Sequence, residues 1–206
     1  MSRAKGTVAG VVLAGGLSSR LGREKALLRV HGRKRPNLLR RTYDLLAALL
    51  PWCWVSCRPG RPRRGYVCIF DEMEGIGPFS GLYAALREAR ERGFSAVLAL
   101  SCDLPFMDEA TLRALLAARE NSSEQTLLTT YCQRETGFIE ALTAVYETEA
   151  IPFFDRALAE GERKLSRLIP EKRQLRIMYG ETEALPFFNV NYPADLERVR
   201  CLLRAR

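Results

Sequence analysis

Two glycines and two cations follow the first apolar run of the chain. The run covers residues 8–14 and leads into Gly15 and Gly16, after which come Arg20 and Lys25. Glycines leave backbone N–H groups open to an anion because they carry no side chain. The pattern favours a phosphate-binding loop after a buried strand, although it matches neither the P-loop nor the G-x-G-x-x-G motif. The alternative is a strand followed by a solvated basic turn.

A second candidate lies at Asp103, directly after the strongly strand-like run 96–101. A carboxylate at the carboxyl end of a parallel strand is well placed to hold Mg²⁺, which prefers oxygen ligands and usually keeps substrate phosphates and waters. The alternative is that Asp103 only caps the turn before Pro105. Residue type and position therefore predict a magnesium ligand here, with a local structural role as the competing interpretation.

The elements that must position these residues alternate along the first half of the chain. Strand-like and helix-like patterns in turn indicate an α/β fold with a parallel sheet. Predicted strands are 8–14, 52–57, 66–70 and 96–101, and predicted helices are 37–50, 80–92 and 108–121. Strands 126–131 and 138–146 predict a hairpin-like insertion or a mixed-sheet edge. The remaining predictions are helices 147–160 and 164–169, an outer strand 176–179 and a last helix 194–203.

Size and charge narrow the classes of function. With 206 residues and 47% hydrophobic residues, the chain is expected to form one domain, residues 1–206. A net charge of +8 suits anionic partners such as nucleotides or pterin phosphates. The basic clusters lack the aromatic residues of a single-strand binder, so we expect no nucleic-acid partner. No apolar run approaches the ~20 residues of a membrane span, and we expect a cytoplasmic protein with six reduced cysteines.

Four segments, in order, resemble the molybdenum cofactor guanylyltransferases, which are MobA-like NTP transferases. The first is Leu-Ala-Gly-Gly at 13–16 with its following Arg20 and Lys25. The others are Gly-Ile-Gly-Pro-Phe-Ser-Gly at 75–81, Cys-Asp-Leu-Pro at 102–105 and Asn-Val-Asn-Tyr-Pro-Ala-Asp-Leu at 189–196. Phe79 stands where the family has leucine, and residues 137–142 depart from the family pattern. The role of that last segment is therefore left open.

The resemblance implies a Rossmann-like three-layer sandwich with a mostly parallel central sheet. It also implies transfer of GMP from GTP to the phosphate of molybdenum-bound molybdopterin, with release of pyrophosphate. Arg20, Lys25 and Asp103 are then the catalytic residues, and Asp103 binds Mg²⁺. The implied nucleotide-binding residues are Leu13, Ala14, Gly15, Gly16, Lys25, Ser56, Asp71, Gly77 and Asp103. Molybdoenzymes or cofactor-handling proteins are the implied protein partners.

The segment near the C-terminus gives a further substrate prediction. Asn189 and Asn191 alternate across an extended stretch, so both can face a cleft while Val190 packs inward. The alternative is that they only cap the last helix.

The preference for guanine as the nucleotide base is inferred from one residue. Related cytidylyltransferases tend towards Leu-Ala-Ala-Gly, and Gly15 of this chain leaves more room for a purine, which favours GTP. The alternatives are a molybdenum cofactor cytidylyltransferase, a sugar-1-phosphate nucleotidyltransferase, and a nucleotide-binding regulatory protein without turnover.

Overall fold

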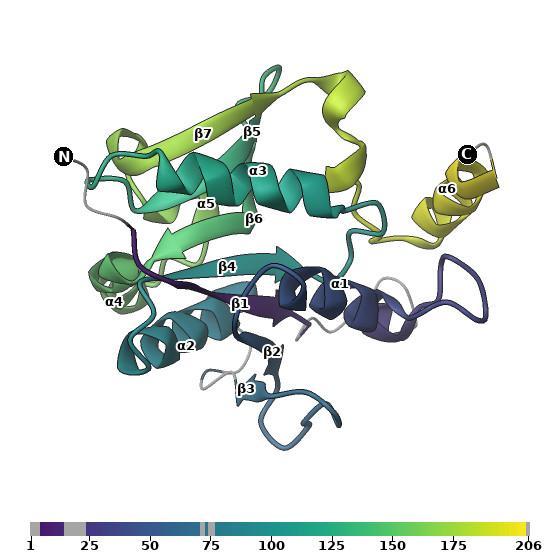
Figure 1. Ribbon diagram of the computed structural model, residues 1–206, viewed down its shortest axis with the longest axis horizontal. Coiled ribbons are helices and arrows are strands. Elements are labelled where there is room, and N and C mark those ends of the chain that lie inside the picture. Colours follow the sequence, from purple (N-terminus) through teal and green to yellow (C-terminus); the bar gives the residue numbers. More distant parts are fainter. Residues whose placement is uncertain (1–4, 15–23, 71–72, 74–76, 205–206) are drawn as a thin grey trace.

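A seven-stranded sheet runs through the middle of the protein, as the computed structural model in Figure 1 shows. The structure describes residues 5–14, 24–70, 73 and 77–204. The strands are β1 (Val8–Leu13), β2 (Cys53–Cys57), β3 (Cys68–Phe70), β4 (Ala96–Ser101), β5 (Leu128–Gln133), β6 (Ile139–Glu147) and β7 (Gln174–Tyr179). The helices are α1 (Leu38–Ala47), α2 (Pro78–Glu91), α3 (Glu109–Glu120), α4 (Ile151–Glu160), α5 (Leu165–Leu168) and α6 (Pro193–Arg204).

The strand order is β3-β2-β1-β4-β6-β5-β7. Every neighbouring pair is parallel except the two pairs that β6 makes, with β4 and with β5. The predicted mostly parallel sheet is therefore confirmed. Strands β1 and β4 lie side by side at its centre, and their buried, nearly continuous apolar runs are typical of parallel strands covered on both faces.

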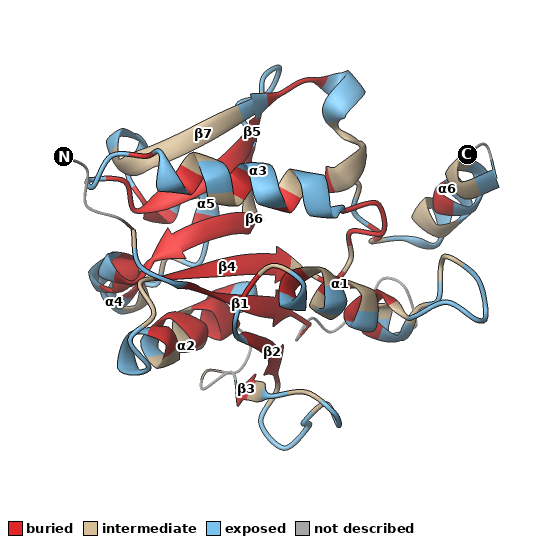
Figure 2. Ribbon diagram, in the orientation of Figure 1, coloured by how far each residue is buried: buried red, intermediate tan, exposed pale blue. Residues whose placement is uncertain are grey.

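Helices cover both faces of the sheet, which confirms the three-layer sandwich. On one face, α2, α4 and α5 share a buried core with Val11 and Ala99, and on the other face α1 and α3 share one with Val12 and Leu100. Alternate residues of a strand point to opposite faces, so each central strand contributes to both cores. Figure 2 shows the central strands buried and the outer helix surfaces exposed.

The β5–β6 pair differs from the prediction. These strands form a hairpin, but it is neither an insertion nor the edge of the sheet, because β6 pairs with β4 and β7 covers β5. The predicted outer strand 176–179 does lie at the edge, as part of β7. The first residues of the predicted helix 147–160 instead finish β6 and form a 3₁₀ turn before α4.

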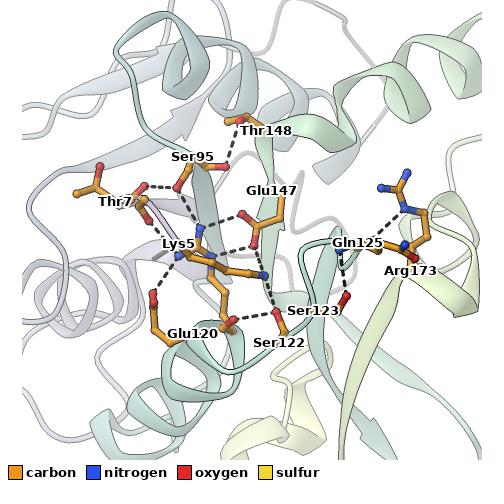
Figure 3. Close-up of polar contacts among 12 residues, drawn as sticks. Lys5, Thr7, Ser95, Glu120, Ser122, Ser123, Gln125, Glu147, Thr148 and Arg173 are labelled. Atoms are coloured by element: carbon orange, nitrogen blue, oxygen red, sulfur yellow. Dashed lines mark hydrogen bonds and ion pairs between the residues drawn. The ribbon is translucent and has the colours of Figure 1, made fainter. Parts of the chain in front are cut away.

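A buried ion pair holds the end of the sheet where β1 and β4 begin. The Arg119 guanidinium, at the end of α3, donates to both carboxylate oxygens of Glu147 over 2.8 and 2.9 Å. It also donates to the backbone oxygen of Gly6 and to Ser95 Oγ. Figure 3 shows Glu147 within this network, next to Lys5 and Ser95. A buried ion pair is stable only when its remaining donors and acceptors also have partners. These extra contacts therefore offset part of the desolvation free energy of the two buried charges.

Helix α6 stands apart from both helix layers, beyond the carboxyl end of β4 (Figure 1). It packs through a small third cluster in which Val199 and Val190 are fully buried against Phe106, Leu28 and other apolar side chains. The C-terminal helix is thereby attached to the two loops that follow β1 and β4. Within the described part of the chain, none of the helices is both long and apolar enough to cross a membrane.

Candidate nucleotide-binding site

Three neighbouring parallel strands end at the same level of the sheet. Leu13, the last residue of β1, lies opposite Ser56 of β2 on one side and Ser101 of β4 on the other. In open α/β sheets, ligands bind in the crevice outside the carboxyl ends of such strands. The loops that follow β1 and β4 are the two that carry the strongest sequence candidates, Lys25 and Asp103.

Lys25, Asp103 and Asn191 meet at this edge. Lys25 begins a single 3₁₀ turn, Lys25–Leu27, and its Nζ atom donates to Asp103 Oδ2 over 3.3 Å and to Asn191 Oδ1 over 2.6 Å. The Lys25 and Asp103 side chains are 18% and 16% exposed, so the cluster is partly open to solvent. Charged hydrogen bonds in such a place are stronger than in open water. The structure thus unites one cation, one carboxylate and one amide from three distant parts of the sequence.

Local contacts fix the orientation of Asp103. Ser101 Oγ donates to Asp103 Oδ1 over 2.7 Å, and the backbone N–H of Val190 donates to the Asp103 backbone oxygen over 2.9 Å. The carboxylate therefore has Ser101 and Lys25 as its partners, and the interpretation of Asp103 as the cap of the turn before Pro105 finds no support in these contacts.

The two asparagines before α6 behave differently. Both the Asn191 and Tyr192 N–H groups donate to Asp195 Oδ2 over 2.8 Å, which anchors Asn191 to the first turn of α6. The Asn191 side chain is then able to reach Lys25. Asn189 instead donates from Nδ2 to the backbone oxygen of Phe187 over 3.3 Å. The structure brings Asn191 into the cluster, while the substrate role of Asn189 stays a prediction.

The other predicted nucleotide-binding residues divide into two groups. Leu13, Ala14 and Ser56 are buried at the ends of β1 and β2, with 6%, 7% and 2% exposure. Gly77 precedes α2 with φ of 69°, a conformation that favours glycine. The predictions at Gly15, Gly16, Arg20 and Asp71 fall outside the residues that the structure describes.

The departure from the family pattern at Phe79 has a structural explanation. The Phe79 ring is 1% exposed and lies 5.2 Å from the Phe154 ring, centroid to centroid, with Tyr83 beside both. Phe79 thus belongs to the core between α2 and α4. A phenylalanine in place of leucine here fills the core between α2 and α4 and makes ring contacts with Tyr83 and Phe154.

The donor set of the cluster fits Mg²⁺. Asp103, Asn191 and Ser101 offer carboxylate, amide and hydroxyl oxygens, the atom type that Mg²⁺ prefers. The described residues hold no group of three or more His, Cys, Asp or Glu side chains suited to a metal. Mg²⁺ binding here would therefore rely on one carboxylate plus substrate phosphates, as is common for this ion.

Sequence reasoning missed two residues that support the cluster. Ser101 orients Asp103, and Asp195 holds the backbone of Asn191. Each lies close in sequence to a residue that was predicted: Ser101 comes two positions before Asp103, and Asp195 four after Asn191. A hydroxyl at a strand end and an acidic residue in the first turn of a helix were the available signals.

Solved structures of other proteins share the fold of this chain. The molybdopterin-guanine dinucleotide biosynthesis protein A of Archaeoglobus fulgidus aligns with a TM-score of 0.74 at 24% identity, covering 96% of this chain and all of its own. The 2-C-methyl-D-erythritol 4-phosphate cytidylyltransferase of Thermus thermophilus aligns with a TM-score of 0.64 at 20% identity, covering 97% and 99%. The chain therefore has the α/β fold of the nucleotidyltransferases.

The sequence comparisons identify the family. The model of the MobA-like NTP transferase domain matches residues 10–176. A relative in Opitutus terrae, named "Probable molybdenum cofactor guanylyltransferase", is 31% identical over 207 residues and covers 97% of this chain and 98% of its own. This chain belongs to the MobA-like NTP transferase family, which confirms the predicted resemblance.

Proposed function

We propose that this protein transfers GMP from GTP to the phosphate of molybdenum-bound molybdopterin, giving the guanine dinucleotide cofactor and pyrophosphate. The observation that carries the proposal is the cluster of Lys25, Asp103 and Asn191 at the carboxyl edge of β1 and β4. All three lie in segments that resemble the guanylyltransferases. The name of the Opitutus terrae relative supports the same activity.

In the proposed reaction, an oxygen of the acceptor phosphate attacks the α-phosphorus of GTP. A new phosphorus–oxygen bond forms there, the bond to the bridging oxygen breaks, and pyrophosphate leaves with its electron pair. Lys25 and Arg20 offset the negative charge that develops on the phosphates, and Asn191 holds the Lys25 ammonium in place. Asp103 would hold Mg²⁺, and the bound ion would supply further positive charge beside the triphosphate. The rate then depends chiefly on positioning.

The choice of guanine rests on Gly15 and on the named relative. A molybdenum cofactor cytidylyltransferase and a sugar-1-phosphate nucleotidyltransferase are the enzymatic alternatives, and the likeness to a cytidylyltransferase at the level of the fold leaves the base open. The Asn191 contact favours the proposal over the sugar-phosphate alternative, because Asn191 lies in the ending that resembles the guanylyltransferases. We place the activity in the cytoplasm, with molybdoenzymes or cofactor-handling proteins as recipients of the product.

The test is to incubate the protein with Mg²⁺, molybdenum-loaded pterin cofactor and either GTP or CTP, and to follow pyrophosphate release and product mass. Asp103→Asn is expected to lower the rate by about 100-fold or more, since it removes a charged group at the reacting phosphates. The matched control is Asp108→Asn, which makes the same chemical change in the same loop. Asp108 Oδ1 accepts from Thr111 N–H at the start of α3, and asparagine caps a helix as well as aspartate does.

Each outcome has one meaning. Product with GTP, lost in Asp103→Asn and kept in Asp108→Asn, supports the whole proposal. Product with CTP alone would be consistent with the transfer mechanism but would show that guanine is not the preferred base. Equal activity of the two variants would show that Asp103 has no catalytic role. A wild-type protein that binds nucleotide but turns over neither GTP nor CTP would favour a regulatory protein.

A further inference from the structure

A small basic pocket lies beside the loop that carries Asp103. Its volume is about 380 Å³, and His31, Arg35, Pro36 and Arg41 line it. None of these four residues carries a carboxylate. The pocket is formed by the segment before α1 and the first turn of that helix, and two of its side chains reach across to the loop after β4. No feature of the predicted or proposed function uses these residues.

The strongest sign of a ligand is the Arg41 guanidinium. Its Nη2 atom donates to the backbone oxygen of Met107 over 2.6 Å. Its Nη1 atom is shielded from solvent and has no hydrogen-bond partner within the described part of the chain. Burial lowers the pKa of Arg41, and the charge of Asp108 only partly opposes that effect. A charged donor without a partner costs more free energy than a neutral one, so an anion at this place would remove a penalty.

The pocket also contains the imidazole of His31, whose protonation depends on the charges nearby. Its Nε2 atom lies 2.9 Å from the backbone oxygen of Pro105. A carbonyl oxygen can only accept, so Nε2 carries the proton and the neutral ring has its other nitrogen free of one. Burial is the main cause that lowers the pKa of His31, and the charges of Arg41 and Arg35 act in the same direction. A bound anion would oppose both of those charges.

We propose that this pocket binds a phosphate group, either as the free ion or as part of a phosphate monoester. Arg35 and Arg41 both line the pocket, and a planar guanidinium group can donate to two phosphate oxygens at once. A phosphate monoester carries between one and two negative charges at neutral pH, which matches two guanidinium groups better than a single carboxylate does. Arg41 would supply Nη1, the guanidinium nitrogen without a partner among the described residues, to such an oxygen.

The proposal is independent of the proposed function. The pocket contacts the loop that carries Asp103 through Pro105 and Met107, but it shares no residue with the Lys25, Asp103 and Asn191 cluster. A phosphate here could come from the second substrate or from the medium. The experiment must separate these sources.

His31 makes the test direct because it is the one histidine of the sequence. Its imidazole signals in an NMR spectrum of the whole protein, observed at constant pH, report on this pocket alone. The protein is titrated with inorganic phosphate and, separately, with ribose 5-phosphate as a simple monoester. We expect saturable movement of the His31 signals with at least one of them. A preference for the monoester would indicate a substrate-borne phosphate, and a preference for inorganic phosphate the free ion.

Two arginine variants test whether the phosphate binds in this pocket. Arg35→Gln removes an exposed pocket cation with little risk to folding, and it is expected to weaken binding by about tenfold or more, the usual cost of a charged hydrogen bond. Arg40→Gln is the matched control, because it makes the same change one position from Arg41, where Arg40 pairs with Asp44 outside the pocket. Its affinity should equal that of the wild type. His31 signals that do not move up to about 10 mM ligand, a concentration that covers millimolar dissociation constants, or equal affinity of the two variants, would overturn the proposal.

Discussion

Replacing Asn191 by alanine gives the sharpest test of the cluster. The Asn191 amide oxygen accepts from Lys25 Nζ over 2.6 Å, a shorter contact than the 3.3 Å between Lys25 and Asp103. Alanine removes that acceptor and leaves Lys25 with Asp103 as its partner in this cluster. The ammonium would then lie closer to the carboxylate and farther from the phosphates. We expect Asn191→Ala to slow nucleotidyl transfer although the residue itself takes no part in bond making.

The size of the effect follows from the contact. A hydrogen bond to a charged group contributes about 1.5–3 kcal/mol. If the whole contribution is made in the transition state, kcat/KM falls by about 10- to 150-fold, since each 1.36 kcal/mol is a factor of ten. The stability of the fold should change much less, because the Lys25 side chain remains partly exposed and can be hydrated.

The assay is pyrophosphate release under limiting nucleotide, with a parallel urea unfolding curve for each protein. Asn189→Ala is the matched comparison, because it removes the same side chain two positions away, where the amide donates only a 3.3 Å contact to the Phe187 backbone oxygen. The loss for Asn191→Ala should exceed that for Asn189→Ala several-fold. A loss below about threefold for Asn191→Ala, less than 1 kcal/mol, would refute the view that it holds Lys25 for catalysis.

Two further predictions concern stability. Arg119→Ala should cost about 3–5 kcal/mol in urea unfolding, because it removes the bidentate partner of buried Glu147 and leaves that carboxylate with only the 3.5 Å contact to Lys5. Arg113→Ala, on the exposed face of the same helix, should cost less than about 1 kcal/mol. Similar costs for the two variants would contradict the importance of the buried pair. The pKa of His31 in the folded protein lies below its ordinary value of 6.5, so the unfolded chain binds the proton first as the pH falls. The free energy of unfolding should therefore decrease as the pH drops through about 6.5, and His31→Gln should reduce that slope; an unchanged slope would show that His31 is not responsible.

The sheet was predictable where sequence patterns act locally. The run 96–101 is buried throughout most of its length and forms β4 with those bounds, and Asn37 and Asp108 cap α1 and α3 as their residue types indicate. The position of β6 was not predictable in the same way. Its pairing with β4 is decided by tertiary packing, and alternation along a strand carries no information on which neighbour it will join.

The site was predictable to the extent that chemistry depends on residue type. Lys25 and Asp103 stand out because a cation or a carboxylate after an apolar strand is uncommon. Asn189 and Asn191 could not be told apart, since alternation places both on one side of an extended segment. What separates them is the Asp195 carboxylate, which turns the backbone at Asn191. Arg41 gave no signal, because an arginine in a helix is usually a solvated residue and its burial arises from the fold.

The attachment of α6 has a consequence for protein synthesis. A nonsense mutation just after Phe188 would produce a chain with all seven strands and five of the six helices of the described structure, yet without Asn191. Because the ribosome makes the chain from its N-terminus, every strand of the sheet is synthesised before Asn191. Lys25, which donates to the Asn191 side chain, lies 166 positions earlier in the sequence. Synthesis of the segment that carries Asn191 is thus a late step in assembling the site, and truncated products would lack both Asn191 and some of the apolar side chains that cover Phe106.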